Sequence, residues 1–274
     1  MTEQNNPIFY IISDSVGETA LRATNAALAQ YPQLTNARLK RYPFINSLTE
    51  LSPILEEAKK VQAIIITTLV NDELNQFAEE FTQNHKIPYH NVVRPIMNII
   101  HQETQLTASE QAGSLHRLDD HYFDRIQAIE FAVKYDDGKN RKGFKLADIV
   151  LLGVSRSSKT PLSMYLANKS YKVANLPIFP EVHIPEEIYQ VDPRRIFGLT
   201  ASPLYIQQIR KKRVKMMGMS EDSSYTSMER VKHELMFADD LFYRLKANVI
   251  YIENQSIEEL SEQIITQYNY NMYS

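Results

Sequence analysis

The stretch LLGVSRSSKTPLSMYLA, residues 151–167, decides the fold of the second half of the chain. An apolar run ends at Gly153, a polar segment follows, and a helical pattern begins at Thr160 with Pro161 in its first turn. The spacing matches the phosphate-loop pattern G-x-x-x-x-G-K-[ST], except that Ser158 takes the place of the second glycine. The stretch therefore predicts a strand, a tight phosphate-binding turn and a helix.

The side chains of this loop suit phosphate chemistry. Backbone N–H groups and a helix N-terminus attract the anion, Lys159 would reach the terminal phosphates, and the Thr160 hydroxyl would complete a Mg²⁺ shell. Arg156 adds a guanidinium, and further donors are the hydroxyls of Ser155, Ser157 and Ser158. A left-handed backbone at Ser158 would cost about 1–2 kcal/mol, which phosphate contacts could offset. On the motif alone, a serine-rich turn between a strand and a helix remains the alternative.

Strands and helices alternate through the rest of the chain. Apolar and β-branched runs predict strands over residues 8–13, 37–42, 63–68, 89–93, 148–152, 172–179, 195–199 and 248–253. Periodic patterns predict helices over residues 48–60, 72–84, 160–169, 203–215 and 225–246, and a mainly helical region from 96 to 135. Capping boxes at Ser15–Glu18 and Ser256–Glu259 open the first and last helices. This alternation indicates a largely parallel sheet covered on both faces.

The polar stretch DDGKNRKGFK, residues 136–145, is the best candidate for a domain boundary. We therefore predict an α/β protein of two parts. An N-terminal parallel-sheet α/β domain, residues 1–145, would be followed by a P-loop kinase-like nucleotide-binding domain, residues 146–274.

Composition narrows the class of protein further. The chain is 43% apolar and 23% charged, as in soluble globular proteins, and its net charge of −3 gives no general preference for nucleic acid or an anionic membrane. No run reaches the roughly 18 apolar residues that span a bilayer. The absence of cysteine excludes a thiolate zinc site and a cysteine nucleophile. We expect a cytoplasmic protein without a nucleic-acid or membrane partner; apolar helix faces are compatible with a homodimer but do not require one.

Three stretches resemble one protein family: GVSRSSKTPLSMYLANKSYKVANLP, ISDSVGETA near the N-terminus, and the run from YDDG to ADIVLLGVSR. They look like the pyruvate, phosphate dikinase regulatory proteins and the related phosphoenolpyruvate synthase regulatory proteins. The resemblance extends from Ile12 to the final helix. Members of this family have glycine or serine where this chain has Ser158, so the departure from the phosphate-loop pattern does not weaken the assignment.

This resemblance implies a bifunctional enzyme. As a serine/threonine kinase it would use ADP to phosphorylate a threonine near the catalytic phosphohistidine of pyruvate, phosphate dikinase. As a phosphorylase it would use inorganic phosphate to remove that group and release pyrophosphate. The ADP-binding segment would be Gly153, Val154, Ser155, Arg156, Ser157, Ser158, Lys159 and Thr160. Phosphoenolpyruvate synthase as the target, a small-molecule kinase or ATPase, and a non-catalytic nucleotide-binding adaptor remain alternatives.

Acidic residues elsewhere are further candidates. Asp14 follows the first predicted strand and could orient Mg²⁺ or take a proton from the target threonine, as could Glu18. The alternative for both is a cap that stabilises the helix N-terminus. Asp136 and Asp137 precede Gly138 and are interpreted as an acidic turn.

Three further features of the sequence are candidates for functional roles. A metal could bind the cluster His116, Asp119, Asp120, His121 and Asp124, although a solvated helix face is favoured. The basic run RKKRVK, residues 210–215, is expected at the surface, with Arg210 and Arg213 suited to a phosphate or partner contact. Glu253 ends the last predicted strand where a Walker B acid could stand. The general base and the acid that positions Mg²⁺ stay unassigned.

Overall fold

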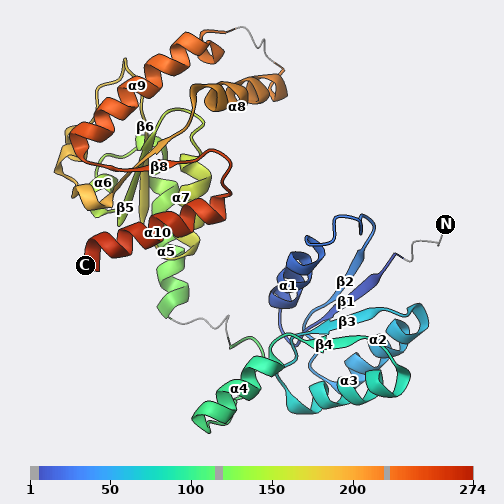
Figure 1. Cartoon of the computed structure of the whole chain (residues 1–274). Helices are drawn as coiled ribbons and strands as arrows, with labels where there is room; N and C mark the ends of the chain where they lie inside the picture. The colour runs from blue at the N-terminus through green and yellow to red at the C-terminus, as the bar shows by residue number, and fades with distance from the viewer. Residues whose placement is uncertain (1–5, 115–119, 219–222, 274) are drawn as a thin grey trace. The chain divides into compact units, whose positions relative to one another are not determined.

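The computed structural model describes residues 6–114, 120–218 and 223–273, and the chain divides into two compact units, Met1–Arg117 and Leu118–Ser274 (Figure 1). This division falls before helix α5 (Asp120–Lys134), whereas the sequence pattern placed a boundary after Lys145. The reason is that α5 packs on helix α7 (Lys159–Asn168) and contacts strand β6 (Val173–Pro177), both of which belong to the second unit.

The first unit is a parallel sheet flanked by helices, as predicted. Its strands are β1 (Ile8–Ile12), β2 (Arg38–Tyr42), β3 (Ile64–Thr67) and β4 (Tyr89–Asn91). Its helices are α1 (Glu18–Leu28), α2 (Leu48–Val61), α3 (Asp72–His85) and α4 (Arg94–Thr104). The strand order is β2-β1-β3-β4, and all pairs are parallel. Helices α2 and α3 pack together, and the core beneath them includes Tyr10, Ile12, Leu51, Leu55 and Ile65.

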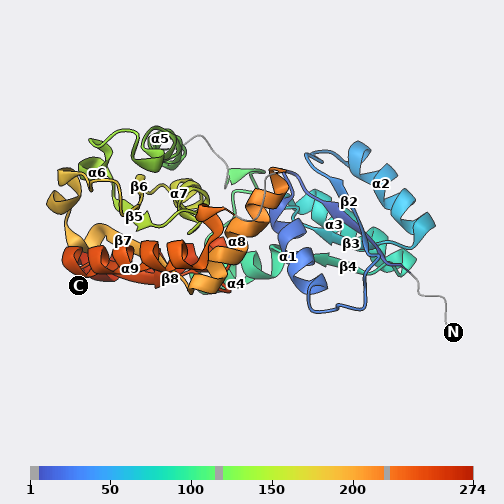
Figure 2. The same ribbon diagram turned by 90° about the horizontal axis from the view of Figure 1, so that it is seen from above.

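The second unit repeats this arrangement with a larger core. Its strands are β5 (Ile149–Gly153), β6, β7 (Ile196–Thr200) and β8 (Asn248–Tyr251), in the order β6-β5-β7-β8 and all parallel. With α5 and α7, its helices are α6 (Gly143–Leu146), α8 (Pro203–Met216), α9 (Met228–Leu245) and α10 (Ile257–Tyr273). Short 3₁₀ turns are η2 (Asp136–Gly138), η3 (Glu186–Gln190), η4 (Pro193–Arg195) and η5 (Ser224–Thr226). Helix α7 contacts α5 and α10. Helix α9 contacts β7 and α8 (Figure 2).

The strand order of the second unit creates a natural binding position. From β5 the chain passes through α7 to β6 on one side, and it then crosses to β7 on the other side of β5. In open parallel sheets, ligands bind outside the carboxyl ends of the strands at such a reversal. Gly153, the last residue of β5, therefore ends where this rule expects a ligand.

Helix boundaries differ from the sequence prediction most at α1, in the region before α5, and at α9, which begins at Met228 rather than Tyr225. Helix α1 begins at Glu18 rather than after Ser15, because Gly17 has a left-handed φ of 78° and no side chain caps the helix. The region predicted as mainly helical contains α4 and α5, and α4 ends where Gln105 adopts a left-handed φ of 57°. The last capping box is confirmed, because Ser256 and Glu259 accept hydrogen bonds from each other's backbone N–H groups. Within the described ranges, no helix is both long and apolar enough to cross a membrane.

Candidate phosphate-binding site

The site lies where β5 ends and α7 begins. Strand β5 is fully buried between β6 and β7, so that Gly153 stands opposite Pro177 and Leu199. A Cβ atom on Gly153 would lie 2.4 Å from the Ser157 Oγ and 2.9 Å from the Leu199 carbonyl oxygen. Only glycine allows the chain to turn this tightly at the end of the strand. The strand, turn and helix predicted from the sequence are confirmed.

Two residues of the turn have left-handed backbones although neither is glycine. Arg156 has a φ of 73° and Ser158 a φ of 62°. Each such residue carries about 1–2 kcal/mol of strain, and strain of this kind concentrates at ligand-binding sites. Ser158 therefore adopts the conformation for which the phosphate-loop pattern uses glycine. Turns with left-handed residues can aim successive backbone N–H groups at one anion.

Lys159, the first residue of α7, points back toward the loop. Its Nζ donates a hydrogen bond to the Val154 carbonyl oxygen at 2.9 Å, and the residue is only 5% exposed. Burial lowers the pKa of Lys159 to about 8, against the opposing effect of the Asp137 and Asp136 carboxylates. An anion bound beside this ammonium would stabilise its charged form. Lys159 is thus buried but lacks a direct carboxylate partner within the described residues.

The Asp136 carboxylate, which the sequence predicts only as part of an acidic turn, contacts the loop. The Asp136 Oδ1 accepts hydrogen bonds from the Thr160 Oγ1 at 2.9 Å and from the Asn175 Nδ2 at 2.7 Å. Asn175, on β6, also accepts a hydrogen bond from the Asp137 backbone N–H at 3.0 Å. The acidic turn predicted here forms as η2, and it brings a carboxylate beside the hydroxyl expected to ligate Mg²⁺. Carboxylate and hydroxyl oxygens suit this hard cation.

A pocket of about 420 Å³ opens at the loop, a size within the range of small-molecule sites. One side is polar and belongs to the loop and to Asp137; the other is apolar. The lining residues are Asp137, Ser155, Arg156, Ser158, Lys159, Thr160, Pro161, Pro177, Phe179 and Ile209. Phosphates could contact the polar side while an aromatic base contacts the apolar side. The pocket therefore has the two surfaces that a nucleotide needs.

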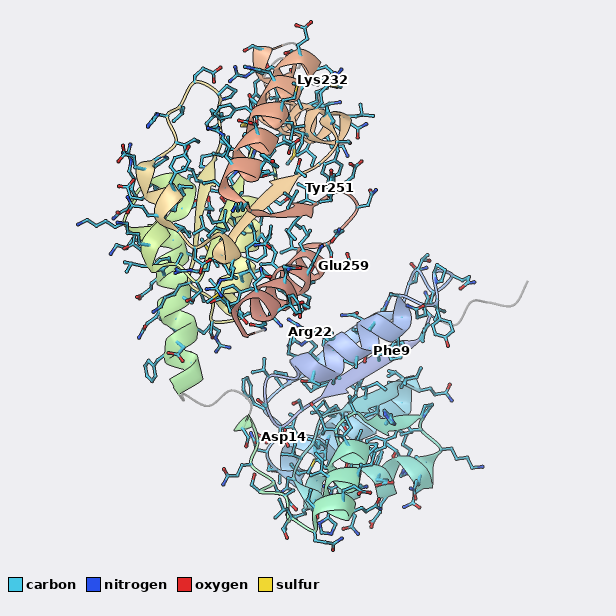
Figure 3. All side chains as sticks on the ribbon, turned by 60° about the vertical axis from the view of Figure 1, so that its left-hand side comes forward. Phe9, Asp14, Arg22, Lys232, Tyr251 and Glu259 are labelled. Atoms are coloured by element: carbon cyan, nitrogen blue, oxygen red, sulfur yellow. The ribbon has the colours of Figure 1, made fainter. Side chains whose placement is uncertain are left out.

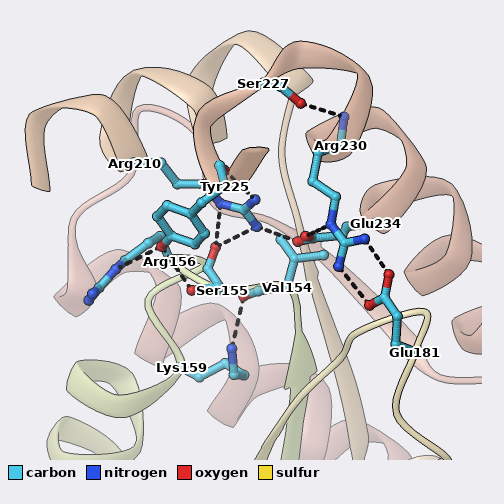
Figure 4. A network of polar contacts seen from close by, with 10 residues as sticks. All are labelled: Val154, Ser155, Arg156, Lys159, Glu181, Arg210, Tyr225, Ser227, Arg230 and Glu234. Carbon is cyan, nitrogen blue, oxygen red and sulfur yellow. Dashed lines mark hydrogen bonds and ion pairs between the residues drawn. The ribbon is translucent and has the colours of Figure 1, made fainter. Parts of the chain in front are cut away.

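The basic run at residues 210–215 differs from expectation at its first residue. Arg210 is fully buried, and its Nη2 lies 2.5 Å from the Glu234 Oε2 (Figure 4). It also donates to the carbonyl oxygens of Ser155 at 3.3 Å and Tyr225 at 3.1 Å. Arg210 is therefore not a surface contact for phosphate, because it supports the loop from behind. Arg213 is exposed, as predicted.

Asp14 and Glu18 lie in the first unit. Asp14 follows β1 (Figure 3), is 5% exposed, and accepts a hydrogen bond from the Val70 backbone N–H at 2.7 Å. Burial raises the pKa of its carboxyl group, and that hydrogen bond opposes the shift. Glu18 pairs with Arg22. Neither acid is among the residues that line the pocket at the loop, and Asp14 is occupied locally in fixing its own loop.

Glu253 and the possible metal cluster are the remaining candidates. Glu253 accepts a hydrogen bond from the Ser202 backbone N–H at 3.2 Å, at the start of α8, and it is not among the residues that line the pocket at the loop. In the proposed metal cluster, His116 and Asp119 and the side chains of Asp120 and His121 lie outside the described residues. Among the residues that the structure does describe, no group of three or more potential ligands is placed to hold a metal.

These features define an α/β protein of kinase-like fold with a candidate anion site at the end of a central parallel strand. The kinase/pyrophosphorylase family matches residues 9–265, nearly the whole chain. The protein belongs to this family.

Similar proteins from other bacteria have names that fit this family. The chain is 46% identical over 259 residues to the "putative pyruvate, phosphate dikinase regulatory protein 2" of Staphylococcus epidermidis, covering 94% of this chain and 95% of the relative. A similarly named protein of Staphylococcus saprophyticus is 48% identical over 250 residues, covering 91% and 92%. Another, from Alkaliphilus oremlandii, is 44% identical over 254 residues, covering 93% and 91%.

Replacing Ser158 with glycine should stabilise the protein. Glycine avoids a left-handed penalty of about 1–2 kcal/mol but has about 0.5–1 kcal/mol more backbone entropy to lose, so a net gain of up to about 1.5 kcal/mol is expected. Urea unfolding would measure it. Ser158→Ala, which keeps the left-handed strain, is the matched control and should show no gain in stability. Equal stability of the two variants would contradict the presence of strain at this position.

Anion binding should weaken as pH rises through about 8, the pKa of Lys159 in the free protein. A bound dianion raises that pKa, so binding above it requires proton uptake, and affinity falls by up to about tenfold per pH unit. Sulfate is the suitable probe because its charge stays constant over this range. Calorimetry at several pH values would show the decline in the wild type and none in Lys159→Met. A flat wild-type profile would contradict this role of Lys159.

Proposed function

We propose that the protein regulates pyruvate, phosphate dikinase by two opposed phosphoryl transfers at the loop of residues 153–160. It would be an ADP-dependent serine/threonine kinase and a phosphate-dependent phosphorylase. The observation that carries the proposal is the loop with its buried Lys159 and the Asp136–Thr160 contact, in a chain of the kinase/pyrophosphorylase family. The names of the relatives support the dikinase as the protein substrate.

The two reactions share one kind of bond change. In the kinase direction, the threonine oxygen attacks the β-phosphorus of ADP, the bond to the bridging oxygen breaks, AMP leaves, and the hydroxyl proton is released. In the phosphorylase direction, an oxygen of inorganic phosphate attacks the phosphorus of phosphothreonine. The bond to the threonine oxygen breaks, that oxygen takes up a proton, and pyrophosphate forms.

The loop residues supply the positioning and charge neutralisation that such transfers need. Lys159 and Arg156 would neutralise charge that develops on the transferred group, and backbone N–H groups of the loop would hold its oxygens. The same cradle would hold the β-phosphate of ADP in one direction and inorganic phosphate in the other. One site would then serve both reactions.

A Mg²⁺ ion fits this arrangement. Thr160 would supply a hydroxyl ligand, and the Asp136 carboxylate, 2.9 Å from that hydroxyl, would bind directly or through water. When bound, the ion would neutralise phosphate charge. Asp14 belongs to the first unit, and a role for it with the acceptor threonine rests on the sequence alone.

Two other functions are compatible with the same loop. Phosphoenolpyruvate synthase could replace the dikinase as the target, because the loop does not identify the acceptor protein. A small-molecule kinase or ATPase would prefer ATP and need no protein target. Activity on each purified target, and the preference for ADP over ATP, separate these functions.

The proposal is tested by incubating the protein with ADP and the phosphohistidine form of the dikinase. Mass spectrometry should show a new phosphothreonine in the dikinase and one AMP for each phosphate transferred. Addition of inorganic phosphate should then remove the group and release pyrophosphate. ATP consumption without phosphothreonine would contradict the proposal and favour the small-molecule enzyme.

Replacing Lys159 with alanine should slow both reactions by at least about a hundredfold, because each loses the cation that stabilises the transferred group. Lys232, an exposed lysine on α9 (Figure 3), provides the matched control, and Lys232→Ala should keep full activity. If Lys159→Ala loses the kinase reaction but keeps full phosphorylase activity, a single shared cradle is wrong.

A further inference from the structure

Tyr225 contacts the phosphate loop from outside the loop. It lies in η5, between α8 and α9, and its hydroxyl oxygen is 3.0 Å from the Ser155 Oγ (Figure 4). The same oxygen accepts a hydrogen bond from the Arg156 Nε at 3.3 Å. Ser155 and Arg156 line the pocket, whereas Tyr225 is not among its lining residues. Tyr225 thus touches two pocket side chains without facing the ligand position itself.

The tyrosine ring is held in place by the buried arginine. The Arg210 guanidinium carbon lies 4.6 Å from the centre of the Tyr225 ring, and its Nη1 donates to the Tyr225 carbonyl oxygen. A cation over an aromatic face is attracted to it, and the more so where water is excluded. One residue, Arg210, therefore fixes both the ring and the backbone of Tyr225.

A chain of ion pairs fixes Arg210 in turn. Glu234 is only 3% exposed. One of its carboxylate oxygens accepts a hydrogen bond from Arg210, and the other accepts one from the Arg230 Nε at 2.6 Å. Arg230 also forms a bidentate pair with Glu181 and holds the pKa of that carboxyl group at about 2. Glu181 follows β6 two residues after Phe179, which lines the pocket. The network therefore joins the support of the loop to the opposite, apolar wall.

The contact with Tyr225 constrains the orientation of Arg156. Arginine side chains lose considerable rotamer entropy when they bind a ligand, unless they are already oriented. Here the Nε bond anchors the guanidinium plane, and the two terminal nitrogens make no other hydrogen bond within the described residues. Those nitrogens form the fork that binds two phosphate oxygens together. An anchored Nε leaves this fork free for a ligand.

We propose that Tyr225 is a positioning residue that holds Arg156 ready to bind the terminal phosphate of a nucleoside diphosphate. The inference rests on the proposed function and deepens it by naming how the β-phosphate is recognised. Discrimination of ADP from AMP then depends on a hydroxyl outside the loop. The hydroxyl acts through Arg156, so its effect disappears when Arg156 is absent.

The test is a double-mutant cycle in binding. Calorimetric titrations with ADP, pyrophosphate and AMP are compared for the wild type, Tyr225→Phe, Arg156→Ala and the double variant. Tyr225→Phe keeps the ring over Arg210 and should weaken ADP and pyrophosphate binding about fivefold to tenfold, as expected for loss of a hydrogen bond to a charged group. AMP binding should change by less than about twofold. In the Arg156→Ala background, the second substitution should have no further effect.

A matched substitution controls for the loss of a hydroxyl. Tyr243, on α9, is 85% exposed, and Tyr243→Phe should bind all three ligands like the wild type. Unchanged ADP binding by Tyr225→Phe, an equal loss for ADP and AMP, or the same loss with and without Arg156 would overturn the positioning role. A wild-type protein that does not bind ADP would overturn the proposed function as well. The two failures are therefore distinguishable.

Discussion

The close approach of Gly153 to the Leu199 carbonyl and the Ser157 side chain is the constraint on which the site depends. A side chain at this position would push the loop away from the sheet and move every residue up to Lys159. Because the space is absent, the chain must turn at once. The turn then imposes left-handed backbones on Arg156 and Ser158. The strain of the loop is thus a consequence of where β5 ends.

Electrostatics explains why such a strained loop can still attract an anion. Among the described cations near the loop, Arg210 is paired with Glu234 and serves the fold. Breaking a buried pair of this kind typically costs about 3–5 kcal/mol, so it is a fixed support rather than a mobile ligand. Within the described ranges, the hydrogen-bond partner of the Lys159 ammonium is the Val154 carbonyl, and that of the Arg156 guanidinium is the Tyr225 hydroxyl. Both cations line the pocket, where they face the Asp137 carboxylate, and neither forms an ion pair within the described residues.

The sequence predicted the local features of this site and missed the distant ones. Gly153, Lys159 and the left-handed turn at Ser158 follow from spacing along a few consecutive residues. Asp136 reaches Thr160 only because Asn175, on β6, fixes the acidic turn, and such a three-part contact leaves no local pattern. The basic run at residues 210–215 was predicted to be exposed for the same reason. Its sequence does not indicate that Arg210 points inward to pair with Glu234.

The fold was predicted in a similar way. Alternating strands and helices identified both parallel sheets, but the unit boundary was displaced because α5 has a helical pattern without a sign of which sheet it covers. Its partner is α7, whose N-terminus carries Lys159. Helix α5 therefore packs against the helix that carries Lys159. The η2 turn follows α5 directly and places Asp136 beside Thr160.

The central claim is that the loop of residues 153–160 holds the β-phosphate of ADP while that phosphate moves to a protein. The most direct measurement uses ADP with a radioactive β-phosphate and purified dikinase in its phosphohistidine form. The account predicts that the label enters a threonine of the dikinase, that Lys159→Ala slows the transfer at least about a hundredfold, and that inorganic phosphate then returns the label as pyrophosphate. Label that never leaves the nucleotide, or transfer that is unaffected in Lys159→Ala, would contradict it.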